Sequence, residues 1–263
     1  MNTYTREPAV AGAFYPADRN SLKDQLEQLL TDTDTTADTC PRAIIAPHAG
    51  YIYSGPVAAP AYHTLLKFRD QIKRVVLLGP SHRVAINGLA LTGADFFSTP
   101  LGVIPIDKAA NKMLAHHHDI DFIEQAHLYE HSLEVHLPFL QTVLNDFVLV
   151  PIVVGDAPPE LVATALEELM TDDSTICVVS TDLSHFHDYN TAQKIDSSTS
   201  QAILEMNFKA IGYENACGRN PLNGVLFWAK MHHYKIRQLD LRNSGDTAGS
   251  KDRVVGYGSY LIS

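Results

Sequence analysis

Short apolar runs alternate along the chain with longer segments in which apolar residues recur at helical spacing. The runs that predict buried strands cover residues 43–46, 75–78, 89–92, 147–154, 176–180, 236–241 and 254–262. Helical patterns cover residues 22–30, 108–114, 133–144, 159–170, 191–207 and 221–231, and Pro138 should kink the third of these or start it late. Strands that alternate with helices form βαβ units. The pattern therefore predicts an α/β protein whose central sheet is mostly parallel and covered by helices on both faces.

Composition changes this picture little but excludes several classes of protein. The 263 residues are 45% hydrophobic and contain no Pro/Gly/Ser-rich linker, so we expect one domain over residues 1–263. No apolar stretch approaches the roughly 20 residues of a membrane span, and the N-terminus lacks the apolar region of a signal peptide. The formal net charge is −10 without any Lys/Arg cluster, which argues against nucleic-acid binding.

The three cysteines, Cys40, Cys177 and Cys217, are odd in number and far apart. This spacing argues against a disulfide framework and fits a reducing compartment, so we expect a cytoplasmic protein.

The 13 histidines are the unusual feature, and several follow directly after predicted strands. His48 follows the first strand and His82 follows the second, while Asp182 and His185 come after the strand over residues 176–180. Asp246 comes shortly after the strand over residues 236–241. Ligands bind at the carboxyl ends of the strands in open parallel sheets, so these side chains mark a candidate site.

Two histidines and one carboxylate form the facial arrangement of open Fe(II) sites, which makes His48, His82 and Asp246 candidate metal ligands. The alternative is that each histidine is hydrogen-bonded in a turn. Asp182 could orient His185 as a general base. Otherwise Asp182 caps the following segment and His185 packs beneath it.

The segment over residues 130–136 is dense in polar residues before a buried helix. His131 and Glu134 are three residues apart and share a helical face, so we interpret His131 as a pocket residue, while Glu134 lines the pocket or supports a neighbour. Cys217 lies near a predicted helix start, which could lower its pKa. Arg219 could pair with an anion or with a pocket carboxylate.

Several ordered segments resemble the signature motifs of the Memo family. They are PHAGY (47–51), GPSH (79–82), EHSLEVHLPF (130–139), STDLSHF (180–186) and CGRNP (217–221), with similar opening (6–16) and closing (243–257) segments. The resemblance covers essentially the whole chain. It implies a fold similar to that of class III extradiol dioxygenases, which hold Fe(II) with two histidines and one glutamate. It also implies a functional link to a radical-SAM protein.

Carried over by position, His48 and His82 match the two metal-site histidines, and His185 matches the acid/base histidine, with Asp182 beside it. His131 lies in the segment that supplies another catalytic pocket histidine. For the third ligand, this sequence differs from the animal members of the family, which carry a cysteine in the closing segment. Asp246 is the candidate that replaces this cysteine. Around this site we expect a substrate pocket formed by Tyr51, Glu134, Cys217 and Arg219.

These residues are compatible with three alternative functions. The first is a dioxygenase-like oxidoreductase that uses Fe(II), with another divalent metal or none as alternatives. The second is a binding module that keeps the pocket for a peptide or a small anionic ligand without turnover. The third is a metal-dependent hydrolase.

Overall fold

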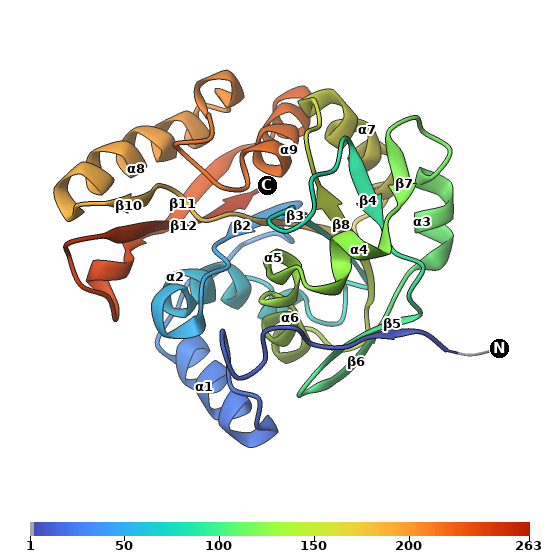
Figure 1. Ribbon diagram of the computed structural model, residues 1–263, viewed down its shortest axis with the longest axis horizontal. Helices are drawn as coiled ribbons and strands as arrows, with labels where there is room; N and C mark the ends of the chain where they lie inside the picture. Colours follow the sequence, from blue (N-terminus) through green and yellow to red (C-terminus); the bar gives the residue numbers. More distant parts are fainter. Residues whose placement is uncertain (1–2) are drawn as a thin grey trace.

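A large mixed sheet runs through the centre of the computed structural model, which describes residues 3–263 (Figure 1). Its strands follow the order β10-β12-β2-β9-β3-β8-β4-β7, and β11 pairs with β12. The bounds of these strands are β2 (Ala43–Ala46), β3 (Arg74–Pro80), β4 (Leu89–Leu91), β7 (Ile120–Phe122), β8 (Val148–Val154), β9 (Thr175–Ser180), β10 (His185–His187), β11 (Ile236–Asn243) and β12 (Val254–Ile262).

The four strands at the centre, β2, β9, β3 and β8, are parallel to one another. Antiparallel pairs flank them, with β12 beside β2 and β4 beside β8. The prediction of an α/β protein is confirmed, and its parallel part is this central block. Because parallel strands run in one direction, the carboxyl ends of β2, β9 and β3 lie at the same edge of the sheet.

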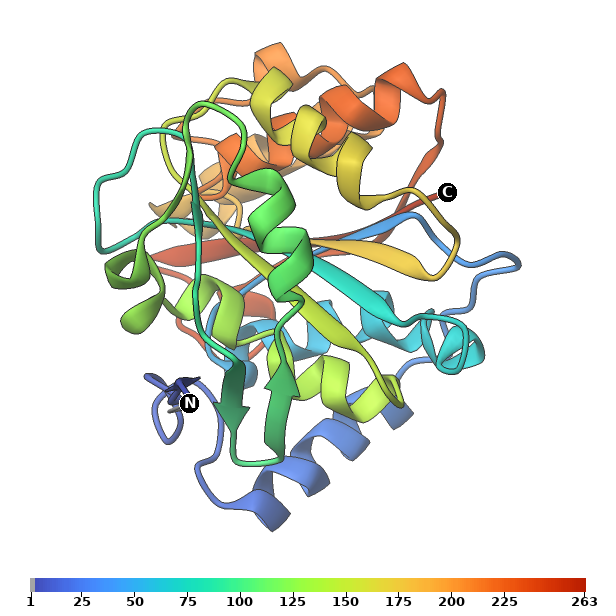
Figure 2. The same ribbon diagram turned by 90° about the vertical axis from the view of Figure 1, so that its right-hand side faces the viewer.

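Helices cover both faces of the sheet (Figures 1 and 2). One face packs against α1 (Arg19–Thr31), α2 (Tyr51–His63) and α6 (Leu137–Val143), and the other against α3 (Lys108–Leu114), α7 (Pro159–Leu169) and α9 (Arg219–Met231). The remaining helices are α4 (Glu124–Leu128), α5 (His131–Glu134), α8 (Tyr189–Leu204), η1 (Leu66–Phe68), η2 (Phe208–Ala210) and η3 (Ser244–Asp246).

Local chemistry explains where several helices begin. Asp18 caps α1 by accepting a hydrogen bond from the Ser21 amide, and Asp188 caps α8 from the Thr191 amide. The helical pattern over residues 133–144 is split into α5 and α6, and Pro138 lies in the first turn of α6. The expected late start at Pro138 is therefore confirmed, because proline fits a first turn, where no intrahelical donor is needed.

The sequence pattern did not predict α2, because Pro56 and Pro60 lie inside it. Pro60 has no amide to donate to the carbonyl of Pro56, four residues earlier. The Arg242 guanidinium of β11 donates to that carbonyl at 2.8 Å. Tertiary contact thus satisfies the acceptor that proline leaves free.

A second sheet joins β1 (Thr5–Arg6), β5 (Phe96–Thr99) and β6 (Gly102–Pro105). It anchors the N-terminal segment, where the buried Arg6 side chain pairs with Glu134 of α5. Across residues 3–263, no helix combines the length and the apolar character needed to cross a lipid bilayer.

Candidate metal centre and its cavity

The carboxyl ends of neighbouring strands place polar side chains at one edge of the sheet. His48 follows β2, Asp182 follows β9 and His82 follows β3. These strands are adjacent in the order β2-β9-β3, so the three residues meet although they are distant in sequence. His131, the first residue of α5, reaches the same place from outside the sheet.

Within the described part of the chain, two groups of side chains have the geometry of possible metal ligands. The first is His48, His82 and His131, whose ligand atoms lie within 4.8 Å of one another. Their ring centroids are 5.1 Å apart for His48 and His82, 5.5 Å for His48 and His131, and 4.6 Å for His82 and His131. The second group is His48, Asp182 and Cys217, so His48 is common to both.

A chain of hydrogen bonds defines the protonation of His48. The Ser180 hydroxyl donates to the Ser132 carbonyl at 2.6 Å, so its oxygen is free to accept from Nδ1 of His48, also at 2.6 Å. Nδ1 therefore carries the proton, and the Nε2 lone pair is available. Burial, followed by the nearby imidazoles, holds the pKa of His48 well below its ordinary value, so this ring is neutral at pH 7.

Glu130 links the other two histidines. Its carboxylate accepts from the backbone amide of His82 at 2.6 Å and from Nδ1 of His82 at 2.9 Å. It also caps α5 by accepting from the amides of His131 and Ser132, both at 2.9 Å, and lies 3.3 Å from Nδ1 of His131. Burial acts to raise the pKa of Glu130, but the hydrogen bonds and charge of His82 outweigh it and lower the pKa to about 2. Glu130 is therefore ionised, so Nδ1 of His82 is the donor and its Nε2 is free.

These residues fit a divalent transition metal. Burial lowers the pKa of His131 to about 4, which leaves its imidazole neutral at pH 7 and able to coordinate. Metal-bound histidines characteristically donate their second ring nitrogen to a carboxylate or another acceptor, as Glu130 and Ser180 allow here. Imidazole donors suit zinc, iron, copper and nickel. His131 is thus a candidate third nitrogen donor, where the sequence suggested a catalytic pocket histidine.

Asp182 and Cys217 lie near Nε2 of His48. Asp182 accepts from the His48 amide at 2.7 Å, and its second oxygen lies 4.0 Å from Nε2 of His48. Burial raises the pKa of Asp182. The Cys217 sulfur is 3.3 Å from Nε2 of His48. Burial also raises the pKa of this thiol, and this corrects the expectation that a helix start would lower it.

His185 faces a cavity next to the histidine cluster. Its Nδ1 donates to the carbonyl of Leu183 at 2.8 Å, which leaves Nε2 with a free lone pair. The hydrogen bond that orients His185 is therefore to this carbonyl, while Oδ1 of Asp182, the residue expected to orient it, accepts from the His48 amide. The cavity has a volume of about 440 Å³ and is lined by Phe14, Ala49, Gly50, Tyr53, His131, Asp182, His185, Ser244, Gly249, Ser250, Arg253, Val255 and Tyr257.

The turn that carries His185 is tied to β12 and α8. The Leu183 amide donates to the Gly256 carbonyl, and the Gly256 amide donates to the Ser184 carbonyl, both at 2.8 Å. The buried Asp196 of α8 accepts from the Ser184 amide at 3.0 Å. A Cβ at Gly256 would lie 2.0 Å from the Asp196 carboxylate, so glycine is required for this close approach. These contacts fix the backbone immediately before His185.

Asp246 is placed differently from the prediction. It belongs to neither ligand group among residues 3–263. Its carboxylate accepts from the Asn243 amide at 3.0 Å, closing a capping box on η3, and from the Tyr189 hydroxyl at 2.5 Å. The predicted position near the carboxyl end of β11 is correct for the backbone, but the cap turns the side chain toward α8.

All four residues expected to form the substrate pocket also lie outside the cavity lining: Cys217 lies against His48, and the other three make structural contacts. Tyr51 is buried, and its hydroxyl donates to the Val135 carbonyl at 2.7 Å. Glu134 is buried against Arg6 and also accepts from the Tyr15 hydroxyl at 2.6 Å, so it is an anchor for the N-terminal segment. The Arg219 guanidinium lies 3.4 Å from the centre of the Tyr213 ring. Each of these side chains is committed to a structural contact.

Sequence reasoning missed the role of Glu130 and most of the cavity wall. A signal for Glu130 existed, because an acidic residue shortly before the helical pattern over residues 133–144 is favourable at a helix N-terminus. Phe14 and Arg253 carried no such signal, since tertiary packing alone brings their segments together at this cavity.

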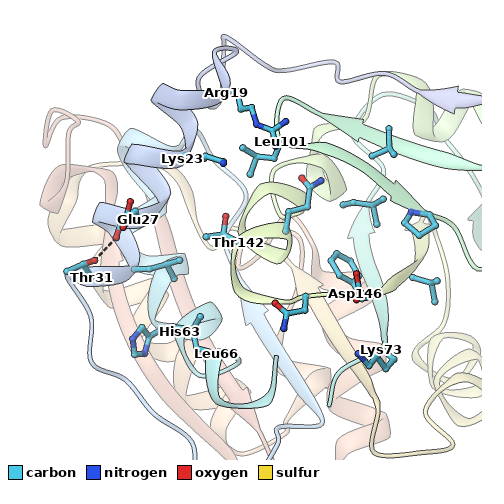
Figure 3. Close-up of a pocket in the computed structure, with 18 residues that line it drawn as sticks. Arg19, Lys23, Glu27, Thr31, His63, Leu66, Lys73, Leu101, Thr142 and Asp146 are labelled. Atoms are coloured by element: carbon cyan, nitrogen blue, oxygen red, sulfur yellow. Dashed lines mark hydrogen bonds between the residues drawn. The ribbon is translucent and has the colours of Figure 1, made fainter. Parts of the chain in front are cut away.

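A hollow larger than this cavity is a separate groove (Figure 3). It has a volume of about 1080 Å³ and lies between α1, α6 and the β5–β6 hairpin, with Arg19, Lys23, Leu101, Val103 and Thr142 among its lining residues. The predicted site residues do not line it. Size alone therefore does not identify the site in this molecule.

Comparison with known proteins agrees with the motifs. The sequence model of the Memo family, described as Memo-like protein, matches residues 6–261. A MEMO1 family protein of Aquifex aeolicus (strain VF5) is 36% identical over 263 residues, covering 96% of this chain and 97% of the relative. One from Thermotoga petrophila is 34% identical, covering 98% and 99%, and one from Saccharolobus islandicus (strain M.14.25 / Kamchatka #1) is 35% identical, covering 96% and 97%. The chain therefore belongs to the Memo family.

Proposed function

We propose that this protein is a metal-dependent oxidoreductase with dioxygenase-like chemistry, and that His48, His82 and His131 hold Fe(II). The observation that carries the proposal is the convergence of three imidazoles whose Nδ1 atoms face Ser180 or Glu130. Such support orients the rings and fixes the tautomer in which Nε2 is free to coordinate. Asp182 lies beside this set, with one carboxylate oxygen 4.0 Å from Nε2 of His48, and could supply an oxygen ligand.

A bound ferrous ion supplies the redox chemistry toward dioxygen and Lewis acidity toward a substrate oxygen. The chain supplies the remaining functions. Nε2 of His185, free of protein partners, accepts a proton from a substrate hydroxyl and later returns it. Phe14, Tyr53 and Tyr257 provide aromatic walls that suit a planar ring. Asp182, whose pKa is raised by burial, is a second group able to carry a proton beside His48.

The test is metal analysis of protein purified without oxygen. We expect the wild type to retain iron or to bind added Fe(II), and the His48→Ala/His82→Ala double variant to lose it. A double variant of two exposed histidines, His116→Ala/His118→Ala, is the matched control and should keep the metal. Equal metal content in all three proteins would refute the ligand assignment.

Activity is tested separately by measuring dioxygen uptake with a panel of catechols. Uptake that disappears in His185→Ala, while the metal is retained, would support the proton-transfer role. Retained metal without any uptake would contradict the oxidoreductase proposal and favour a binding module.

One observation favours a second candidate, a metal-dependent hydrolase. Three imidazoles without a carboxylate also form the ligand set of some catalytic zinc sites, where the ion activates a water molecule. His185 would then transfer the proton of that water. Zinc-loaded protein that hydrolyses ester or phosphoester substrates, but consumes no dioxygen when loaded with iron, would establish this alternative.

A further inference from the structure

The cavity beside the histidine cluster has the size of a site for a small molecule. Its volume of about 440 Å³ falls in the lower part of the range of ligand pockets. The aromatic side chains of Phe14, Tyr53 and Tyr257 line it together with His131 and His185. Planar side chains of this kind favour a flat ring over a flexible aliphatic chain.

Arg253 adds a positive charge to this lining. It lies in the connection between β11 and β12 and is exposed. Throughout residues 3–263, no carboxylate lies within ion-pair distance of its guanidinium, which instead lies 5.0 Å from the centre of the Phe186 ring. The ring contact orients the guanidinium and leaves its hydrogen-bond donors free.

The neighbouring charges of the same connection are directed elsewhere. The Lys251 ammonium lies 4.4 Å from the centre of the Tyr189 ring, outside this cavity lining. Asp252 accepts a hydrogen bond from Ser250 at 3.1 Å and does not pair with Arg253. Among the described residues that line this cavity, Arg253 is therefore the only lysine or arginine that a ligand can contact.

The other ionisable groups of the cavity do not cancel this charge. Asp182, the carboxylate of this lining, is buried beside His48 and forms no ion pair with Arg253 among the described residues. A ligand that enters thus meets an imidazole cluster at one end and a guanidinium on the exposed connection. Guanidinium groups bind carboxylates through two parallel hydrogen bonds.

We propose that the substrate is a small aromatic acid, whose ring occupies the cavity and whose carboxylate is bound by Arg253. The oxygen substituent of its ring points toward His185 and the histidine cluster. This inference rests on the proposed function, because the proposed position of the metal determines which end of the cavity the ring oxygen faces. Arg253 thereby takes the anion-binding role that the sequence had suggested for Arg219.

The test compares two probes of nearly equal shape, 4-hydroxybenzoate and 4-hydroxybenzamide, by calorimetry under anaerobic conditions. In the wild type we expect the benzoate to bind about tenfold more tightly, the effect of one charge-assisted contact. Arg253→Met should abolish this preference, and Arg253→Lys should retain part of it. Lys251→Met, which removes a charge from the same connection, should keep the full preference.

Equal affinity of the two probes, absence of binding by both, or a preference that survives in Arg253→Met would overturn the proposal. Binding is measured without turnover, so it is independent of dioxygen uptake. A protein that prefers the benzoate through Arg253 but consumes no dioxygen would retain this inference and lose the oxidoreductase function.

Discussion

Replacing Glu130 with glutamine tests whether this residue organises the histidine cluster. Its carboxylate accepts hydrogen bonds from the His82 amide, Nδ1 of His82, and the amides of His131 and Ser132. A glutamine side chain has one acceptor oxygen and one amino group. The best fit places its oxygen toward the three donors shared by Oε1, so the amino group faces the His82 amide, which is itself a donor.

The variant thus loses one hydrogen bond to a charged group and creates a contact between two donors. We expect the free energy of unfolding to fall by about 2 kcal/mol. The weaker support of His82 should reduce metal affinity about 10- to 100-fold.

Metal affinity is measured by competition with a chelator, and stability by urea denaturation of the metal-free protein. Glu124→Gln is the matched control, because Glu124 also accepts from a backbone amide, that of Gly93, and from the Thr92 hydroxyl, but contacts no histidine of the cluster. It should alter stability without altering metal affinity. Unchanged affinity in Glu130→Gln would refute the reasoning.

Three further predictions concern the scaffold and are checked by urea denaturation of the metal-free protein. Arg6→Met leaves the buried Glu134 without its partner and should lower the unfolding free energy by about 3–5 kcal/mol, whereas a loss below 1 kcal/mol would contradict the anchor role. Gly256→Ala forces the Asp196 carboxylate aside and should lower the unfolding free energy by about 1–3 kcal/mol. An unchanged unfolding free energy would show that the Asp196 carboxylate has room for a Cβ at this position. Burial lowers the pKa of His136 to about 3, so below pH 6.5 the unfolded chain binds a proton that the folded chain does not. Stability should therefore decrease as the pH falls from 6.5 toward 3, by about 1.4 kcal/mol per pH unit from this group, and His136→Gln should show a smaller slope.

The sequence predicted the central strands well because they are buried on both faces and read as uninterrupted apolar runs. The first strand was placed at residues 43–46, as observed for β2. The sequence pattern also placed His48 and His82 at the edge of the sheet where the parallel strands end, because that inference needs only the direction of the strands. Helix α2 was missed because the compensation for its prolines comes from Arg242, which is 186 residues away from Pro56.

Side-chain direction was the limit of the sequence reasoning at the site. Asp246 has the right chemistry and lies on the right connection, but the capping box of η3 rotates its carboxylate away from the histidines. His131 was assigned to the pocket from its helical spacing, whereas its approach to His48 depends on how α5 docks on the sheet. Such docking is determined by contacts between distant segments, and a local pattern does not contain them.

The β11–β12 connection contributes Ser244, Gly249, Ser250 and Arg253 to the wall of the cavity, but the histidine cluster and its supports come from other segments. Substitutions or insertions in this connection can therefore alter which molecules enter without disturbing the groups that would hold the ion. Under the proposed function, the residues that select a compound and the residues that hold the ion can change independently of one another.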